Sequence, residues 1–141
     1  MFEGRVAKGF EAMDHMDVDA VMRSWADDGV FEYPGHSALS GRMEGKPAIE
    51  AFMRALFERL DTWHFTVKHV ALANPLGLAY TNTIFVEWEV DEMSKAGIAA
   101  HNNGVTVFTY RHGKLVAARD YIFDTTVVDQ VIGPAEAPLA A

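Results

Sequence analysis

The sequence contains no cysteine among its 141 residues. Disulfide bonds and zinc sites built from thiolates are therefore excluded, and the composition fits a reducing compartment. Basic residues are also few: 12 Lys and Arg stand against 20 Asp and Glu, for a net charge of −8, and they form no cluster along the chain. Because nucleic-acid binding requires a basic stripe that neutralises phosphates, we expect no nucleic-acid partner.

Long apolar segments and cofactor motifs are missing too. No segment approaches the roughly 20 apolar residues that would cross a bilayer, and the charged residues 1–5 are not typical of a signal peptide. The chain has no glycine-rich phosphate loop and no metal-ligand motif such as H-E-x-x-H. His64 and His69 are five residues apart and would face opposite sides of a strand. We therefore expect a cytoplasmic protein without a membrane partner, metal or cofactor.

Half of the residues are hydrophobic, which is a globular composition. The length favours one domain, which we place at residues 1–133, followed by a flexible C-terminal tail at 134–141, rich in Ala and Pro. Such a chain buries roughly 68–70% of the surface that it exposes when unfolded, so it needs no staple to form a core.

Hydrophobic periodicity predicts helices first and long strands afterwards. The first predicted helix covers residues 2–15. The second runs from an N-cap at Asp17 through Trp25 and is ended by Asp27–Gly29, and the third runs from Pro47 to Leu60. Strands are predicted at 30–33, 63–72, 78–90, 99–110 and 114–124, with loops at 34–45 and 91–97, turns at 74–77 and 111–113, and a final helical turn at 125–131. Helices gathered on one side of an antiparallel sheet indicate an α+β domain.

Asp120 is the main candidate for chemistry. Alternation along residues 114–124 places Val116, Ala118, Asp120 and Ile122 on one face of the strand. A carboxylate among apolar neighbours has its pKa raised by desolvation, and this allows proton exchange near neutral pH. The alternative is that Asp120 binds buried backbone groups or pairs with a cation other than Arg119, which faces the other way.

Three segments carry a resemblance to a known family. These are Asp27-Asp28-Gly29-Val30-Phe31, the segment Gly45-Lys46-Pro47-Ala48-Ile49-Glu50-Ala51-Phe52, and the run from Gly113-Lys114-Leu115 to Arg119-Asp120-Tyr121. Together with the element order they resemble the SnoaL-like branch of the nuclear transport factor 2 superfamily. This resemblance implies a cone-shaped, curved, mixed but mostly antiparallel β-sheet, wrapped by three N-terminal helices around an interior pocket. Members include polyketide cyclases, ketosteroid isomerases, limonene epoxide hydrolases and proteins without known activity.

Of the catalytic positions known in these family members, one is matched in this chain and the others are not. Asp120 lies where polyketide cyclases and limonene epoxide hydrolases are expected to have a catalytic aspartate. Epoxide hydrolases have an Arg and an Asp where this chain has Thr83 and Phe85. Ketosteroid isomerases have an aspartate before a proline where this chain has Tyr33, and a tyrosine at the position of Gly9. Neither of these specific activities is therefore supported.

Other residues are expected around Asp120. Tyr33 and His36 flank Pro34-Gly35 at the expected mouth of the pocket, where a phenol can stabilise an oxyanion and an imidazole can move protons; a solvated His36 is the alternative. Asn102 is expected to face the pocket by the resemblance, with His101 as the alternative and a frayed strand end as a third possibility. The remaining predicted substrate contacts are Thr83, Phe85, Trp25, Phe52 and Leu56.

The long strand at 78–90 offers two faces. We expect Thr81, Thr83, Phe85 and Glu87 to face inward, with Glu87 as a second acid or simply a solvated charge. The apolar face of Asn82, Ile84, Val86 and Trp88 is then expected to lie outside and to pair with a second copy, as the resemblance implies for a homodimer.

Two functional hypotheses follow. The first is a cofactor-independent enzyme of isomerase, dehydratase or cyclase type, which uses general acid/base chemistry on a small, apolar, oxygenated substrate. The second is a non-catalytic module of the same fold that binds a small molecule or dimerises.

Overall fold

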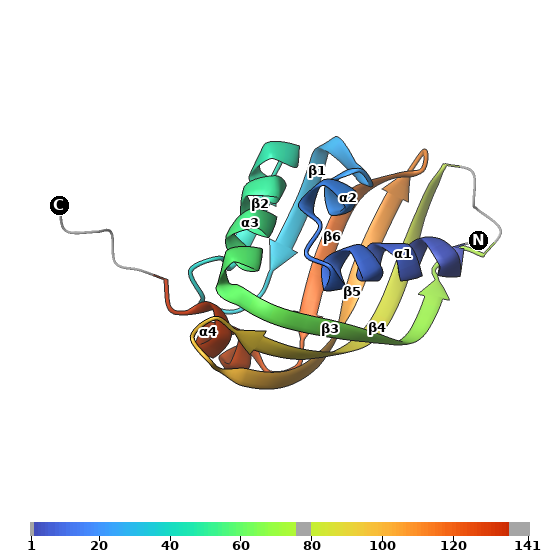
Figure 1. Ribbon diagram of the computed structural model, residues 1–141. Coiled ribbons are helices and arrows are strands. Elements are labelled where there is room, and N and C mark those ends of the chain that lie inside the picture. The colour runs from blue at the N-terminus through green and yellow to red at the C-terminus, as the bar shows by residue number, and fades with distance from the viewer. Residues whose placement is uncertain (1, 76–79, 136–141) are drawn as a thin grey trace.

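The computed structural model describes residues 2–75 and 80–135 of the chain. Four helices and six strands are present in these residues (Figure 1). Their order is α1 (Phe2–Asp14), α2 (Val18–Met22), β1 (Trp25–Tyr33), β2 (Gly41–Glu44), α3 (Lys46–Arg59), β3 (Leu60–Leu72), β4 (Thr81–Ser94), β5 (Ala99–Arg111), β6 (Lys114–Ile122) and α4 (Thr125–Ile132). No described helix is long and apolar enough to span a membrane.

The six strands form one curved, open sheet in the order β2-β1-β6-β5-β4-β3. The β1–β6 pair is parallel and every other pair is antiparallel. The sheet bends around α1, α2 and α3, and α4 lies at the end where β6 stops (Figure 1). This confirms the predicted α+β class and the mixed, mostly antiparallel sheet. Because β6 lies between β1 and β5, the Asp120 strand occupies the middle of the sheet.

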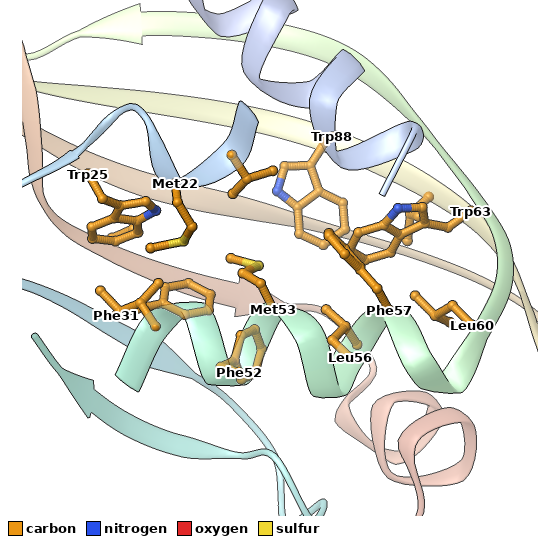
Figure 2. Packing of buried hydrophobic residues seen from close by; sticks show 14 of the residues in the cluster. Met22, Trp25, Phe31, Phe52, Met53, Leu56, Phe57, Leu60, Trp63 and Trp88 are labelled. Carbon is orange, nitrogen blue, oxygen red and sulfur yellow. The ribbon is translucent and has the colours of Figure 1, made fainter. Parts of the chain in front are cut away.

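The main core forms between α3 and the concave face of the sheet. Pro47 in the first turn of α3 needs no hydrogen-bond acceptor there, and the helix buries Ile49, Phe52, Met53, Leu56 and Phe57. Figure 2 shows the rings of Trp25, Phe31, Trp63 and Trp88 gathered over this helix. The apolar spacing that predicted α3 therefore identifies its buried face correctly.

Several predicted boundaries are wrong. Residues Asp27–Gly29 lie inside β1 rather than ending a helix, and β1 carries a register shift between Trp25 and Val30. Residues 41–44, predicted as loop, form the short edge strand β2. Residues 91–94, also predicted as loop, continue β4, where Asp91 pairs with His101. Charged residues are uncommon in strands, so this part of β4 was not recognisable by composition.

Two predictions fall partly outside the described residues. The predicted turn at 74–77 and the start of the strand predicted from Leu78 overlap residues 76–79, and the predicted tail overlaps 136–141.

The two faces of β4 are reversed relative to the prediction. Ile84 and Val86 have no exposed surface and Trp88 is 3% exposed, whereas Phe85 is 41% exposed. The continuous apolar face thus packs against the helices, and the face with Thr83, Phe85 and Glu87 points outward. The physical reason is simple: in a period-2 element the face with more apolar bulk gains more by burial.

Candidate active site

An interior cavity of about 130 Å³ lies between the helices and the concave face of the sheet. Its walls are mainly apolar, and all three tryptophans of the chain line it. The predicted contacts Trp25, Phe52 and Leu56 belong to these walls. The polar and ionisable side chains in the lining are Arg5, Ser24, Tyr33, Glu92, Asn102, Thr106, Tyr110 and Asp120, together with the three tryptophan indoles.

Asp120 lines the cavity, as predicted, and a hydrogen-bonded chain orients it. Trp88 Nε1 donates to Thr106 Oγ1 at 2.9 Å, and Thr106 Oγ1 donates to Asp120 Oδ1 at 2.6 Å. The directions are fixed, because an indole N–H can only donate, which leaves the threonine proton for the carboxylate. Oδ1 is therefore the accepting oxygen, and any proton that Asp120 carries resides on Oδ2.

The second oxygen of Asp120 remains available. It has no hydrogen-bond partner among the described residues. In those residues, every side-chain oxygen or nitrogen that is fully buried does have a partner. Oδ2 therefore keeps accessible surface, and Asp120 lines the cavity. Within the described residues neither a backbone N–H group nor a cation binds the carboxylate, which disfavours the alternative that Asp120 binds backbone or pairs with a cation.

Burial raises the pKa of Asp120 to about 7, and the Thr106 hydrogen bond opposes part of this increase. Desolvation disfavours the charged carboxylate, whereas a donated hydrogen bond stabilises it. A group with this pKa exchanges protons readily at neutral pH.

The strand alternation around Asp120 contains one irregularity. Ala118, Asp120 and Ile122 line the cavity as predicted, but Leu115 lines it in place of Val116. The register shifts opposite Thr109 and Tyr110, so that Tyr110 pairs with Leu115 and Thr109 with Ala117. A bulge of this kind reverses the orientation of the residues before it.

Gly104 makes room for the indole that begins the hydrogen-bonded chain. It pairs with Trp88 across β4 and β5, and a Cβ atom at Gly104 would come within 2.4 Å of the Tyr121 backbone oxygen and 3.0 Å of the Trp88 ring. Any larger residue would collide first with the β6 backbone at Tyr121 and would also crowd the Trp88 ring. The unusual small residue in the segment 101–104 thus supports the orientation of Asp120 through Trp88 and Thr106.

Tyr33 lines the cavity next to Asp120. The parallel register pairs Phe31 with Ala118 and Glu32 with Arg119, which brings Tyr33 beside Asp120. Its ring packs against Phe31 and Phe52, and its hydroxyl has no hydrogen-bond partner among the described residues. Burial, and after it the charge of Asp120, raises the pKa of Tyr33 well above its ordinary value. The phenol is therefore neutral and able to donate a hydrogen bond into the cavity.

Glu92 is a second acid in the cavity wall, and the sequence analysis missed it. Burial raises its pKa to about 7, and no described residue forms a hydrogen bond with its carboxylate. Its neighbours Asp91, Ser94 and Lys95 are also polar, and this composition predicts a polar loop at 91–97. Extending the alternation of β4 by four residues would have placed Glu92 on the same face as Trp88 and Val90.

Asn102 lies at the cavity wall, but its side chain is engaged in the fold. Its Nδ2 donates to the Asp124 carbonyl at 2.8 Å, and its Oδ1 accepts from the backbone N–H groups of Asn103 and Asp124. These bonds hold the start of α4 against β5. Asn102 is thus a structural amide whose polar atoms are largely satisfied by backbone.

Four predicted site residues lie elsewhere. His36 is exposed outside the cavity, where its backbone N–H donates to Asp129 Oδ1, and His101 is exposed and pairs with Asp91 at 2.8 Å. Thr83 and Phe85 point away from the cavity, because β4 turns its other face inward. The predictions that placed these four side chains in the pocket are therefore wrong. No group of three or more His, Asp or Glu side chains in residues 2–75 and 80–135 could hold a metal ion.

Fold and cavity together define a small α+β protein whose curved sheet encloses an apolar chamber. Residues 6–118 match the profile of the SnoaL-like domain, and the chain belongs to this family. No curated protein matches the sequence.

Solved structures of the nuclear transport factor 2-like fold are similar along nearly the whole chain. A protein of unknown function from Burkholderia pseudomallei has a TM-score of 0.76 at 21% identity, covering 90% of this chain and 93% of its own. Bal32a, from a soil-derived mobile gene cassette, has a TM-score of 0.76 at 17% identity, with 90% and 92% covered. TerC, co-crystallised with polyporic acid, has a TM-score of 0.73 at 18% identity, with 90% and 94% covered. At these identities the likeness establishes the fold alone.

Proposed function

We propose that this protein is a cofactor-independent enzyme that moves protons on a small, apolar, oxygenated substrate in the cavity. The observation that carries the proposal is the state of Asp120: one oxygen is held by Thr106, and the other has no partner in the described residues. An apolar chamber around such a carboxylate is the environment in which an acid becomes a base of useful strength at neutral pH.

The residues support a proton-transfer reaction beside a carbonyl. In this reaction Asp120 Oδ2 takes a proton from the carbon next to the carbonyl, and the electrons of the broken C–H bond form an enolate. The Tyr33 hydroxyl donates a hydrogen bond to the developing oxyanion. Return of a proton to a different carbon, from Asp120 or from Glu92, completes an isomerisation. Alternatively, a β-hydroxyl protonated by Asp120 or Glu92 would leave as water and give dehydration, or the enolate carbon would attack a second carbonyl, whose oxygen takes the proton from Asp120, and give cyclisation.

Two acids with a pKa near 7 add to the chemical range of the site. Near neutral pH one of Asp120 and Glu92 can be ionised while the other is protonated, so that base and acid are both present. TerC, a fold relative, was co-crystallised with polyporic acid, which supports an organic ligand in this chain as well.

Turnover of a panel of ketones, enones and epoxides would test the proposal. Wild type should convert at least one compound, and Asp120→Asn should lower kcat/KM by about 10²-fold or more. Asp91→Asn is the matched control, because Asp91 is an exposed aspartate paired with His101 on the other side of β4. No turnover by the wild type across the panel, or equal rates for wild type and Asp120→Asn, would favour the non-catalytic binding function.

We further propose a homodimer through the outer face of the sheet. With Ile84 and Val86 inside, the apolar part of the surface offered to a second copy is Phe85, Val105, Val107 and Tyr121, of which Phe85 and Tyr121 are 41% and 53% exposed. These residues adjoin one another across β4, β5 and β6. Light scattering should report a dimer for the wild type and a monomer for Phe85→Asp. A monomeric wild type would refute the dimer.

A further inference from the structure

A surface groove of about 520 Å³ runs between α1 and α2. Three cations line it: Arg5 and Lys8 lie three residues apart on α1, and Arg23 follows α2. The other lining residues are small: Gly4, Gly9, Ala12, Ala20 and Ser24. A basic cluster therefore exists in space although none is visible along the sequence.

The described part of the chain provides no ion-pair partner for the cations of this groove. No carboxylate is among the lining residues, and within residues 2–75 and 80–135 none of Arg5, Lys8 and Arg23 forms an ion pair. Lys114 adds a fourth cation, since its Nζ donates to the Arg23 carbonyl at 2.9 Å. In a chain with a net charge of −8, a groove that gathers unpaired cations is complementary to an anion.

The groove adjoins the cavity. Arg5, Gly9, Ala20 and Ser24 line both, and a Cβ atom at Gly4 or Gly9 would meet nothing within 4 Å. A single ligand that extends from the groove into the apolar chamber would pass these shared residues. One end of it would lie among the cations and the other near Asp120.

Arg5 connects the two compartments electrostatically. Its guanidinium lies 6.0 Å from the centre of the Tyr110 ring, which lines the cavity, and donates to the Gly113 carbonyl at 3.4 Å. Its charge also opposes the rise that burial causes in the pKa of Tyr110. Arginine binds carboxylate and phosphate through paired hydrogen bonds, so Arg5 is suited to hold an anionic group where the groove adjoins the cavity.

We propose that the substrate is an amphipathic anion: its apolar body fills the cavity, and its carboxylate or phosphate binds Arg5, Lys8 and Arg23 in the groove between α1 and α2. The inference rests on the proposed function for the location of the reacting end and adds the chemical class of the substrate. It also predicts that the groove selects among substrates by charge, while Asp120 acts on the part of the molecule inside the chamber.

Binding of matched probes would test this inference without knowledge of the natural substrate. Phenylalkanoates, phenylalkyl phosphates and the corresponding phenylalkanols share an apolar body and differ in charge. The three tryptophans in the cavity wall provide a fluorescence signal for ligand entry. We expect the anions to bind more tightly than the alcohols, and the difference to shrink as salt rises. The ratio of the two anions distinguishes a carboxylate from a phosphate ligand.

Arg5→Gln/Arg23→Gln should weaken anion binding by about five- to tenfold and leave alcohol binding unchanged within about twofold. Lys95→Gln is the control, because it removes one positive charge from the exposed turn between β4 and β5, outside the groove. Equal binding of alcohols and anions would overturn the inference and leave the acid/base function in place. If no probe binds, both the anion site and the acid/base function are overturned. If the double variant loses alcohol and anion binding equally, the anion site alone is overturned.

Discussion

Carboxylates on the concave and convex faces of the sheet differ in their pairing, and their pKa values are shifted in opposite directions. On the concave face, Asp120 and Glu92 have no cationic partner in the described residues, and burial raises the pKa of each to about 7. On the convex face, Glu32 pairs with Arg119 at 2.6 Å and with Arg42 at 2.8 Å. The hydrogen bond from Arg119 is the main reason why the pKa of Glu32 is lowered.

The contrast is sharpest between two adjacent residues. Asp91 points outward and pairs with His101 at 2.8 Å, whereas Glu92 points into the cavity. Strand alternation alone separates a solvated charge from an acid that can exchange protons at neutral pH. The face of the sheet on which a carboxylate lies therefore matters more for its chemistry than its position along the chain.

The largest expected effect tests the orientation of β4. Ile84→Ala should lower the free energy of unfolding by about 2–5 kcal/mol, because it leaves a cavity in a fully buried site. Phe85→Ala should cost less than about 1 kcal/mol, since the ring is 41% exposed. Urea denaturation at two protein concentrations measures both and separates folding from loss of dimer contacts. A larger cost for Phe85→Ala in the monomer would mean that the strand faces the other way.

The failure to predict this orientation from sequence has a physical cause. Both faces of β4 alternate, and the resemblance suggested that the apolar face meets a second subunit. The choice is decided by the interior of the fold: Ile84, Val86 and Trp88 join the hydrophobic core, whereas Phe85 does not. The helix itself was predictable, because its apolar stripe, Pro47 and the preceding Gly45 all agree.

The candidate site was predictable only in part. Asp120 could be found because a single acid interrupts an otherwise apolar strand face, and Tyr33 because it ends a strand in the same layer. Glu92 was hidden by its charged neighbours, and Thr106 gave no signal, since a threonine is common in strands. His36 was expected at the mouth of the pocket and His101 was the alternative to Asn102, but both side chains are exposed to solvent.

A second effect concerns the cost of ionising Asp120. Its pKa is raised in the folded state from 3.8 to about 7, so the wild type should lose stability as the pH rises through this interval. Asp120→Asn stays neutral and can still accept the Thr106 hydrogen bond. It should match the wild type only below about pH 4, and its advantage in free energy of unfolding should grow by about 2–3 kcal/mol between pH 5 and pH 8. Asp91→Asn should show no such gain in the same denaturation series, and a gain for both would contradict the difference between the faces.

The smallest expected effect separates the two influences on the pKa of Asp120, which are burial and the hydrogen bond from Thr106. Thr106→Val removes the hydroxyl that stabilises the carboxylate, so the titration midpoint of Asp120 should move above its wild-type value. The variant also leaves Trp88 Nε1 without its acceptor, which should cost about 1–2 kcal/mol of stability. Carbon NMR of the Asp120 carboxyl group measures the midpoint directly.

Thr106→Ser restores the hydroxyl and should keep the wild-type midpoint. If Val and Ser titrate alike, burial alone sets the proton affinity of Asp120, and the Trp88–Thr106 chain serves only to orient it.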